Sequence, residues 1–472
     1  MSPKLTRRHF IKASLATVAT IVQGTFILLP AASVGCRPAV NRLPVPVILG
    51  DKNPDPNKAD FELVAQKSRT AFLEGKYTET YGYNGDYLGP VIRVRKGQEV
   101  SIKVKNLLDE ETTVHWHGAL VPGEMDGGPH QVIPAGGEWN PRFTIQQPAA
   151  TIWYHAHPLG KTGEQVYKGL AGLFIIDDEV SENLNIPNDY GVNDIPLVVQ
   201  DRRFAEDGAL LYLTNPMDAV AGMSGDTILV NGAVSPALEV KTVKMRFRIL
   251  NGSNARVYRF SLSDNSSFAQ IASDGGFLES PVELNALTLS PGERAEVIVD
   301  FSNYSVGDVI TLESPGFKIM EFVVRERAED TTTIPDRITT VAKLPESSAV
   351  KTRTFKLIGV GPMANINGLQ MNLKTGMDTI HETVNLGDTE IWEIFGMSMV
   401  HPFHMHGVHF QVLDRNGQPP PANEQGWKDT VLISPEETVR VIARFNYKGI
   451  FMLHCHNLEH EDAGMMLQYE AK

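Results

Sequence analysis

Residues 89–106 read GPVIRVRKGQEVSIKVKN, and residues 235–251 read SPALEVKTVKMRFRILN. In both stretches a proline comes early, apolar residues largely alternate with polar ones, and an asparagine closes the segment. Alternation with a period of two is typical of β-strands that bury one face. Glycine (40) and proline (29) recur between such stretches, which favours short strands and turns over helices. The sequence therefore predicts an all-β protein built from antiparallel sandwiches or Greek-key barrels.

Further repeats divide the chain into thirds. The turn SPGE at 290–293 resembles SPEE at 434–437, and ATIWYHAH at 150–157 resembles GIFMLHCH at 449–456. TVHWHG at 113–118 likewise resembles PFHMHG at 402–407. The first and last thirds thus share two histidine motifs in the same order, and the middle third lacks both. Thirds of this length match the usual size of a domain. We predict a targeting segment at 1–36 and domains at 37–180, 181–335 and 336–472.

Eight of the 14 histidines lie in four His-x-His motifs. Because residues i and i+2 of a strand point to the same face, each motif should present two imidazoles together. Imidazole suits copper, zinc, iron or nickel, and eight imidazoles are too many for one ion. We therefore predict a cluster of several metal ions between the first and third domains. Its candidate ligands are His115, His117, His155, His157, His404, His406, His454 and His456.

A second candidate site combines His401, Cys455, His460 and Met465. Two histidines, one thiolate and a weak axial methionine form the ligand set of an electron-transfer blue-copper site. Cys455 should point away from its neighbours in the cluster, so one backbone step joins the two sites. The alternatives are that Met465 only packs in the core and that Cys455 is an inert buried thiol.

These motifs resemble the four copper signatures of the multicopper oxidases. The matching stretches are HWHG at 115–118, HAH at 155–157, HPFHMHG at 401–407 and HCHNLEHEDAGM at 454–465. The similarity is closest to the bacterial branch that contains laccases and periplasmic cuprous oxidases. It implies three cupredoxin-like domains and four copper ions. By resemblance, type 2 copper takes His115 and His404, and type 1 copper takes His401, Cys455, His460 and axial Met465. The type 3 pair takes His117, His155, His157, His406, His454 and His456.

The resemblance also implies the reaction, in which four one-electron oxidations of a reductant are coupled to reduction of O2 to two waters. Water formation needs protons. Asp126, in EMDGG at 124–128, resembles the acidic residue that the family places near the cluster. Glu461, directly after His460, resembles a second residue of the proton path. The alternative for both is a structural carboxylate that is solvated or hydrogen-bonded.

Two other functions are open on the same motifs. A copper nitrite reductase fits less well, because three domains and four His-x-His motifs point to a trinuclear cluster. A non-catalytic structural protein is the other alternative, since the family includes cell-division proteins that have lost copper ligands. The complete ligand set of this chain argues against it.

Met397 and Met399 precede the ligand His401 and bear on the reducing substrate. Thioethers are soft ligands that select Cu(I), and Met399 matches a substrate-copper ligand of the cuprous oxidases. Those enzymes carry an aspartate in place of Met397, and a long methionine-rich insertion that this chain lacks. We therefore expect a laccase-like enzyme that oxidises phenols without added copper. Cu(I) oxidation should remain as a secondary activity, and Fe(II) is a further candidate donor. The alternative function is a cuprous oxidase for copper tolerance. The alternative for Met397 and Met399 is that both are core residues.

The start of the chain predicts export. Residues 6–12, TRRHFIK, resemble the twin-arginine signal, and a weakly apolar stretch with small residues follows. We expect the twin-arginine translocase as a partner and a periplasmic or other extracytoplasmic location. The alternatives are an ordinary secretory signal or a single membrane anchor, and lipid anchoring at Cys36 is a further alternative. A net charge of −13 disfavours nucleic acid as a partner. We expect a monomer.

Overall fold

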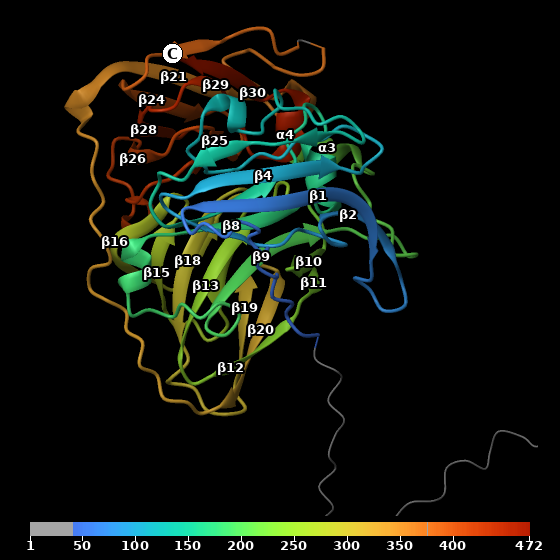
Figure 1. The fold of residues 1–472 in the computed structure, drawn as a ribbon, viewed down its shortest axis with the longest axis vertical. Coiled ribbons are helices and arrows are strands. Elements are labelled where there is room, and N and C mark those ends of the chain that lie inside the picture. The colour runs from blue at the N-terminus through green and yellow to red at the C-terminus, as the bar shows by residue number, and fades with distance from the viewer. Residues whose placement is uncertain (1–40, 375) are drawn as a thin grey trace, which may run out of the picture. The chain divides into compact units, whose positions relative to one another are not determined.

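The computed structural model describes residues 41–374 and 376–472, so the predicted export signal lies outside the described residues. These residues form six β-sheets that follow one another in pairs along the chain (Figure 1). The all-β prediction is confirmed. The strands of each pair fall within one of the ranges 37–180, 181–335 and 336–472, and these domain limits stay predictions.

The first pair of sheets spans residues 58–177. One sheet has the order β2-β1-β4-β5, with β6 beside β4, and the other has the order β3-β8-β7. The strands are β1 (Lys58–Thr70), β2 (Thr78–Tyr83), β3 (Ile92–Arg95), β4 (Glu99–Asn106), β5 (Glu138–Trp139), β6 (Arg142–Thr144), β7 (Ala150–His155) and β8 (Ala171–Asp177).

The middle pair consists of a seven-stranded sheet, β11-β10-β9-β13-β18-β15-β16, and a five-stranded sheet, β12-β20-β19-β14-β17. The strands are β9 (Asp194–Arg202), β10 (Thr227–Val230), β11 (Ala233–Val234), β12 (Ala237–Lys241), β13 (Lys244–Asn251), β14 (Tyr258–Leu262), β15 (Phe268–Ser273), β16 (Gly276–Leu284), β17 (Leu287–Leu289), β18 (Arg294–Asp300), β19 (Val309–Ser314) and β20 (Phe317–Glu326).

The third pair has the orders β22-β21-β24-β28-β26 and β23-β30-β29-β25-β27. The strands are β21 (Ala349–Ile358), β22 (Asn365–Ile366), β23 (Glu382–Val384), β24 (Thr389–Gly396), β25 (His401–Met405), β26 (Phe410–Arg415), β27 (Thr430–Ile433), β28 (Thr438–Arg444), β29 (Gly449–Cys455) and β30 (Met466–Ala471). Short helices join the strands: α1 (Thr162–Lys168), α2 (Glu179–Asn183), α3 (Pro216–Ala221), α4 (Leu458–Ala463), and the 3-10 turns η1 (Gly123–Met125), η2 (Glu346–Ser348), η3 (Gly361–Met363) and η4 (Ala422–Glu424).

The sheets contain both parallel and antiparallel strand pairs, so the prediction of purely antiparallel strands is wrong. Each pair of sheets contains two parallel neighbours: β1 with β4 and β3 with β8, then β9 with β13 and β12 with β20, then β21 with β24 and β23 with β30. Between β1 and β4 the chain passes through the other sheet, so it can return beside β1 in the same direction. Side-chain alternation has the same period in both arrangements, and it cannot tell them apart.

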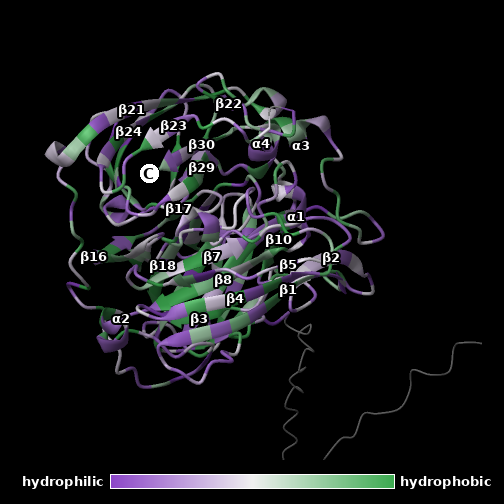
Figure 2. Cartoon of the chain, turned by 45° about the horizontal axis from the view of Figure 1, so that its top comes forward, coloured by the Kyte–Doolittle hydropathy of each residue, from purple (hydrophilic) through white to green (hydrophobic). Residues whose placement is uncertain are grey.

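Each pair of sheets encloses its own hydrophobic core. In β4 every second residue is buried, and in Figure 2 the colours of β1 and β4 change from residue to residue accordingly. β7 is buried on both faces instead. Ile152 and Tyr154 enter the first core, whereas Trp153 packs with Val198 and Leu250 of the middle domain. β7 therefore carries His155 into the interior between domains.

Among the described residues, no helix is both long and apolar enough to span a membrane.

Candidate metal centre

Strand pairing brings the histidine motifs together. His404 in β25 lies opposite His454 in β29, and Phe403 lies opposite Cys455. In the first domain, His115 and His155 lie opposite each other in an antiparallel β-bridge and exchange two backbone hydrogen bonds, with N···O distances of 2.8 and 3.1 Å. Cys455 therefore faces the side of β29 that His454 does not, as the alternation predicts.

All eight motif histidines are buried in one cluster, with side chains from the first and third domains interleaved. The ring of His115 stacks on His406 and the ring of His117 stacks on His404, each pair with centroids 3.7 Å apart. The two rings of each motif lie 4.9–5.7 Å apart, so each motif presents its imidazoles to the same space. The predicted gathering of the motifs into one site is present in the structure.

Hydrogen bonds at the outer nitrogens define which nitrogen of each ring faces inward. The Nδ1 atoms of His115, His155, His404 and His454 lie 2.8–3.1 Å from backbone carbonyls. A carbonyl only accepts, so each Nδ1 carries the proton and each Nε2 presents a lone pair. His117 is reversed, because its Nε2 donates to the Asp429 carboxylate at 3.0 Å and its Nδ1 faces inward.

The inward nitrogens need a cation. Nε2 of His406 and Nε2 of His454 are 3.1 Å apart, although the Nδ1 of His406 donates to Asp126 and that of His454 to a carbonyl. Two lone pairs thus face each other at hydrogen-bond distance with no proton between them. The inward nitrogens of His115, His117, His155 and His404 have no hydrogen-bond partner within the described part of the chain. Imidazole lone pairs that converge in this way fit copper.

Burial favours the neutral imidazoles that metal ligation requires. It lowers the pKa values of His117, His155, His404 and His406 well below the usual value, and the neighbouring imidazoles lower them further. The pKa values of His157 and His456 fall to about 3 for the same reasons.

The second predicted set is also assembled. Cys455 Sγ lies 3.4 Å from Nδ1 of His401 and 3.9 Å from Nδ1 of His460, and all three residues are buried. His460 Nε2 donates to the Val220 carbonyl of α3 at 2.9 Å, which leaves its Nδ1 lone pair toward the sulfur. Burial raises the pKa of the Cys455 thiol, so a bound cation is needed to make the thiolate.

Met465 is fully buried beside this set. Its backbone carbonyl accepts from the Cys455 amide at 3.0 Å, and its amide donates to the His460 carbonyl at 2.9 Å. The residues for a site with two histidines, a thiolate and an adjacent methionine are therefore in place, and this donor set fits copper.

The two predicted carboxylates both contact the histidine cluster. Asp126 accepts from His406 Nδ1 at 2.8 Å, and Glu461 has one oxygen 3.3 Å from His157 Nδ1 and the other 3.1 Å from His454 Nδ1. Burial alone would raise the pKa of Glu461, but the nearby histidines outweigh it and bring the pKa to about 2. Both acids are buried, so the alternative of a solvated carboxylate is wrong.

Asp429 and Arg294 also hold the cluster, and neither was among the residues predicted from the sequence. The Asp429 side chain accepts from His117, and its backbone carbonyl accepts from His404 at 2.8 Å. Burial alone would raise the pKa of Asp429, but the Arg294 guanidinium outweighs burial and lowers it. The available signal was the repeated turn, which reads SPGER at 290–294 and SPEET at 434–438.

The predicted substrate methionines lie at the edge of the third domain. Met397 follows β24 and has 51% of its surface exposed, whereas Met399 is half-buried. The alternative that both are core residues is therefore wrong for Met397.

Comparisons with known proteins agree with this site. Three family models described as multicopper oxidase match residues 64–181, 207–319 and 343–472. The multicopper oxidase mco of Staphylococcus haemolyticus is 38% identical over 91% of this chain and 92% of its own length. The laccase of Bacillus subtilis is 34% identical over 90% of this chain and 97% of its own, and the cell division protein FtsP of a Rahnella strain is 36% identical over 94% and 93%.

Solved structures show the same fold. A laccase from Pediococcus acidilactici superposes with a TM-score of 0.87 at 38% identity, over 92% of this chain and 94% of its own. A laccase-like multicopper oxidase from a lignin-degrading Ochrobactrum species has a TM-score of 0.84 at 39% identity, over 91% and 100%. The chain belongs to the multicopper oxidase family, with cupredoxin-like domains. It is a copper-binding, laccase-like oxidoreductase that uses oxygen as its acceptor.

Proposed function

We propose that the chain binds four copper ions in the arrangement that the motifs predict. Type 1 copper takes His401, Cys455 and His460 with Met465 as axial ligand, and type 2 copper takes His115 and His404. The type 3 pair takes His117, His155, His157, His406, His454 and His456, and the ligand atoms of His157, His406 and His454 lie close enough together to share one ion. The observation that carries this proposal is the convergence of inward lone pairs, above all His406 and His454 at 3.1 Å.

Copper at these positions would take electrons singly from a donor and deliver four of them to O2. The residues of the chain hold the ligands and manage protons. Asp126 holds His406 from one side of the cluster, and Glu461 lies against His157 and His454. Both carboxylates lie against ligand rings of the cluster, where a proton relay to reduced oxygen would be needed. Glu461, whose pKa the histidines lower, would serve as an ionised group that accepts a proton and passes it on.

The reducing substrate is proposed to be a phenol, with Cu(I) as a secondary donor. The type 1 ligand His460 lies in α4, and α4 contacts both α3 and η3. These two elements expose Met217 (57%) and Met363 (72%), and Met397 is also exposed. Exposed apolar side chains mark contact surfaces. These methionines can therefore meet an organic donor, and their thioethers suit Cu(I) as the secondary donor. The Ochrobactrum relative has oxidase activity towards lignin model compounds, which supports the same class of donor.

The Met397→Leu, Met399→Leu double variant tests this substrate assignment. If the thioethers bind Cu(I), Cu(I) turnover should fall at least tenfold while phenol turnover changes less than twofold, because leucine keeps the apolar surface and removes the soft ligand. Steady-state oxygen consumption with each donor, with and without added Cu(II), measures both. A parallel loss of both activities would assign the methionines to packing around type 1 copper.

Two alternatives remain distinguishable. A cuprous oxidase for copper tolerance would oxidise Cu(I) far faster than phenols and would need added Cu(II) for phenol turnover. A non-catalytic structural role, the alternative raised from the motifs, would appear as a copper-loaded protein without oxygen consumption. The buried, complete histidine set favours the oxidase.

We further propose export by the twin-arginine translocase to the periplasm or an equivalent compartment, and a monomeric enzyme. Arg7 and Arg8 in TRRHFIK support export. Changing both to lysine should leave folded precursor inside the cell, as fractionation and immunoblotting would show. Unimpaired export of this variant would contradict the route. Sedimentation of the purified enzyme tests the monomer.

A further inference from the structure

The middle domain contributes no motif histidine, yet one of its turns reaches the cluster. This turn, SPGER at 290–294, joins β17 to β18, and its counterpart in the third domain is SPEET at 434–438. In both turns the glutamate accepts from the serine amide, at 2.7 Å for Glu293 and 2.8 Å for Glu437. The two turns share this backbone hydrogen bond. The residues that differ between them therefore show what is specific to the middle domain.

The first difference is Gly292, which has φ +85° where Glu436 has φ +57°. Glu436 is exposed and tolerates the left-handed backbone with a full side chain. A Cβ atom on Gly292 would lie 2.9 Å from Cδ2 of His456, closer than such atoms approach. Glycine at this position therefore leaves the space that the His456 ring occupies.

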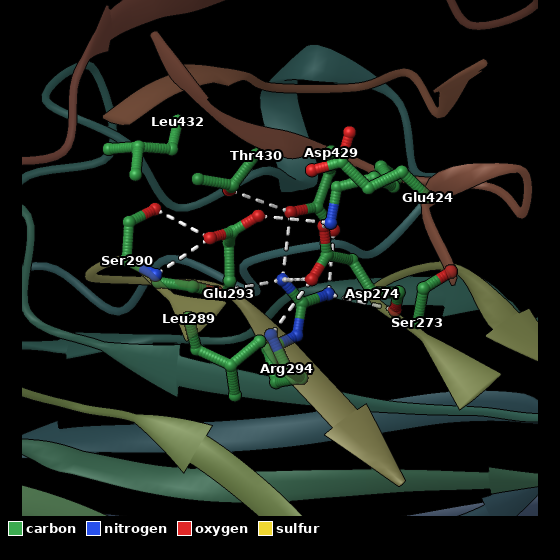
Figure 3. Close-up of polar contacts among 12 residues, drawn as sticks. Ser273, Asp274, Leu289, Ser290, Glu293, Arg294, Glu424, Asp429, Thr430 and Leu432 are labelled. Atoms are coloured by element: carbon green, nitrogen blue, oxygen red, sulfur yellow. Dashed lines mark hydrogen bonds and ion pairs between the residues drawn. The ribbon is translucent and has the colours of Figure 1, made fainter. Parts of the chain in front are cut away.

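The second difference is Arg294, where the third domain has Thr438. The guanidinium is fully buried and forks onto Asp429, with N···O distances of 2.8 and 2.6 Å (Figure 3). Its remaining donors reach the carbonyls of Gly292, Asp274 and Thr151. Because Thr151 is in the first domain and Asp429 in the third, this one side chain joins all three domains.

Asp429 in turn orients two stacked ligand rings. Its carboxylate accepts from His117 Nε2, and its carbonyl accepts from His404 Nδ1. The Thr430 hydroxyl donates to the same carboxylate and lies 3.2 Å from His117 Nε2 and 3.1 Å from His404 Nδ1. Together these contacts make His117 present Nδ1 and His404 present Nε2. Outer hydrogen bonds of this kind fix the tautomer and direction of metal-binding histidines. The packing is close, since a Cβ on Gly118 would lie 2.6 Å from the Arg294 guanidinium.

We propose that the middle-domain turn at 290–294 is a positioning element for the copper cluster: Arg294 holds Asp429 so that His117 takes its binding tautomer and the His404 ring keeps its direction, and Gly292 makes room for His456. The inference rests on the proposed copper sites and extends them to a domain without ligands. Arg294 acts through Asp429, so it is a positioning residue and not a catalytic one.

Arg294→Lys tests the first half. Lysine keeps the charge but cannot bridge both carboxylate oxygens and the three carbonyls. We expect copper retention against a chelator to fall by up to about 10–100-fold, the effect of losing the hydrogen bond from His117 to Asp429, because a displaced Asp429 no longer holds that ligand. The type 2 EPR signal should change, while the type 1 visible band should stay within a few per cent of wild type. Wild-type retention and EPR in this variant would overturn the proposal.

Arg248→Lys is the matched control. Arg248 is also buried in the middle domain and forks onto a carboxylate, that of Asp194, at 2.8 and 2.8 Å. It has no hydrogen bond to Asp429 or to a histidine among the described residues. Its variant should lose stability without altering the type 2 EPR signal. Equal EPR changes in the two variants would reduce Arg294 to general packing and overturn the proposal.

Gly292→Ala tests the second half against Gly316→Ala. Gly316 has a similar φ of +83° in the same domain, but a Cβ there meets nothing within 4 Å. Both variants carry the same backbone strain, and only Gly292→Ala should displace His456 and make the type 3 copper pair visible by EPR. An unchanged type 3 pair in Gly292→Ala would contradict the role of Gly292.

A copper-free readout separates this inference from the proposed function. In histidine-selective ¹⁵N spectra of the apo-protein, His117 should be the Nε2–H tautomer and His404 the Nδ1–H tautomer, and Arg294→Lys should mix the tautomers of His117. Wild-type protein that binds no copper would refute the four-copper proposal, whatever these spectra show. Unmixed tautomers in Arg294→Lys would refute the positioning role alone.

Discussion

At the scale of single residues, the sequence predicted which histidines gather but not which of their atoms would bind. Four His-x-His motifs indicate metal ligands, because the two imidazoles of each motif point to the same face of a strand. The reversed orientation of His117 follows from Asp429, a residue 312 positions away, and no local pattern encodes that contact. Asp126 and Glu461 were found through family resemblance, and the structure adds that both are buried against the histidines.

Asp126→Asn tests proton supply at this scale. Asparagine can still accept from His406 but cannot carry a proton to developing hydroxide. Loss of a general acid typically costs about 10²–10⁴-fold, so reoxidation of the reduced enzyme by O2 should slow by that factor while reduction of type 1 copper by the donor should not. Stopped-flow absorbance resolves the two steps.

Asp126→Glu serves as the control for this prediction, because it restores a carboxyl group and should recover part of the rate. Reoxidation at the wild-type rate in Asp126→Asn would make Asp126 a structural hydrogen-bond acceptor.

At the scale of elements, alternation predicted strands but not their neighbours. Val100, Ile102 and Val104 are buried in β4 as expected, yet the parallel partner β1 was not foreseen. Hydrophobic alternation says which face of a strand is buried and leaves strand direction open. The register of β25 on β29, which sets His404 opposite His454, is likewise a tertiary result.

At the scale of the whole molecule, repeats predicted three β domains and a site shared by the first and third. The role of the middle domain at the cluster was not predicted, because a domain without motif histidines gives no sign of metal ligands. Arg294 and Gly292 become visible only when the turn at 290–294 lies beside Asp429 and His456.

The copper-free protein should lose stability in mild acid. Burial depresses the pKa values of His157, His401 and His456 to about 3, against an ordinary value of 6.5. Between these values the unfolded chain binds protons that the folded chain does not, so stability rises with pH and falls as the pH drops below 6.5. Burial raises the pKa values of three acids, Glu293, Asp462 and Glu459, the last to about 7, and these groups act in the opposite direction. The buried histidines with depressed pKa values outnumber them.

Urea unfolding of the apo-protein at several pH values between 5 and 7.5 measures this effect, and the copper-loaded protein is the comparison. Bound copper should raise the midpoint at every pH in this range without reducing its pH dependence, because these histidines are already deprotonated in the folded apo-protein and forming the Cys455 thiolate releases a further proton. A midpoint that does not change with pH in the apo-protein would contradict the buried, neutral state of these histidines.

The most direct test of the central claim is to count copper in wild type and in Cys455→Ser while recording their visible spectra. We predict four ions per chain and an intense blue band in wild type. The variant should keep three ions, lose the band and consume no oxygen, because serine removes only the thiolate that binds type 1 copper. A blue, active Cys455→Ser protein, or a wild type that holds fewer than four ions when fully loaded, would contradict the account.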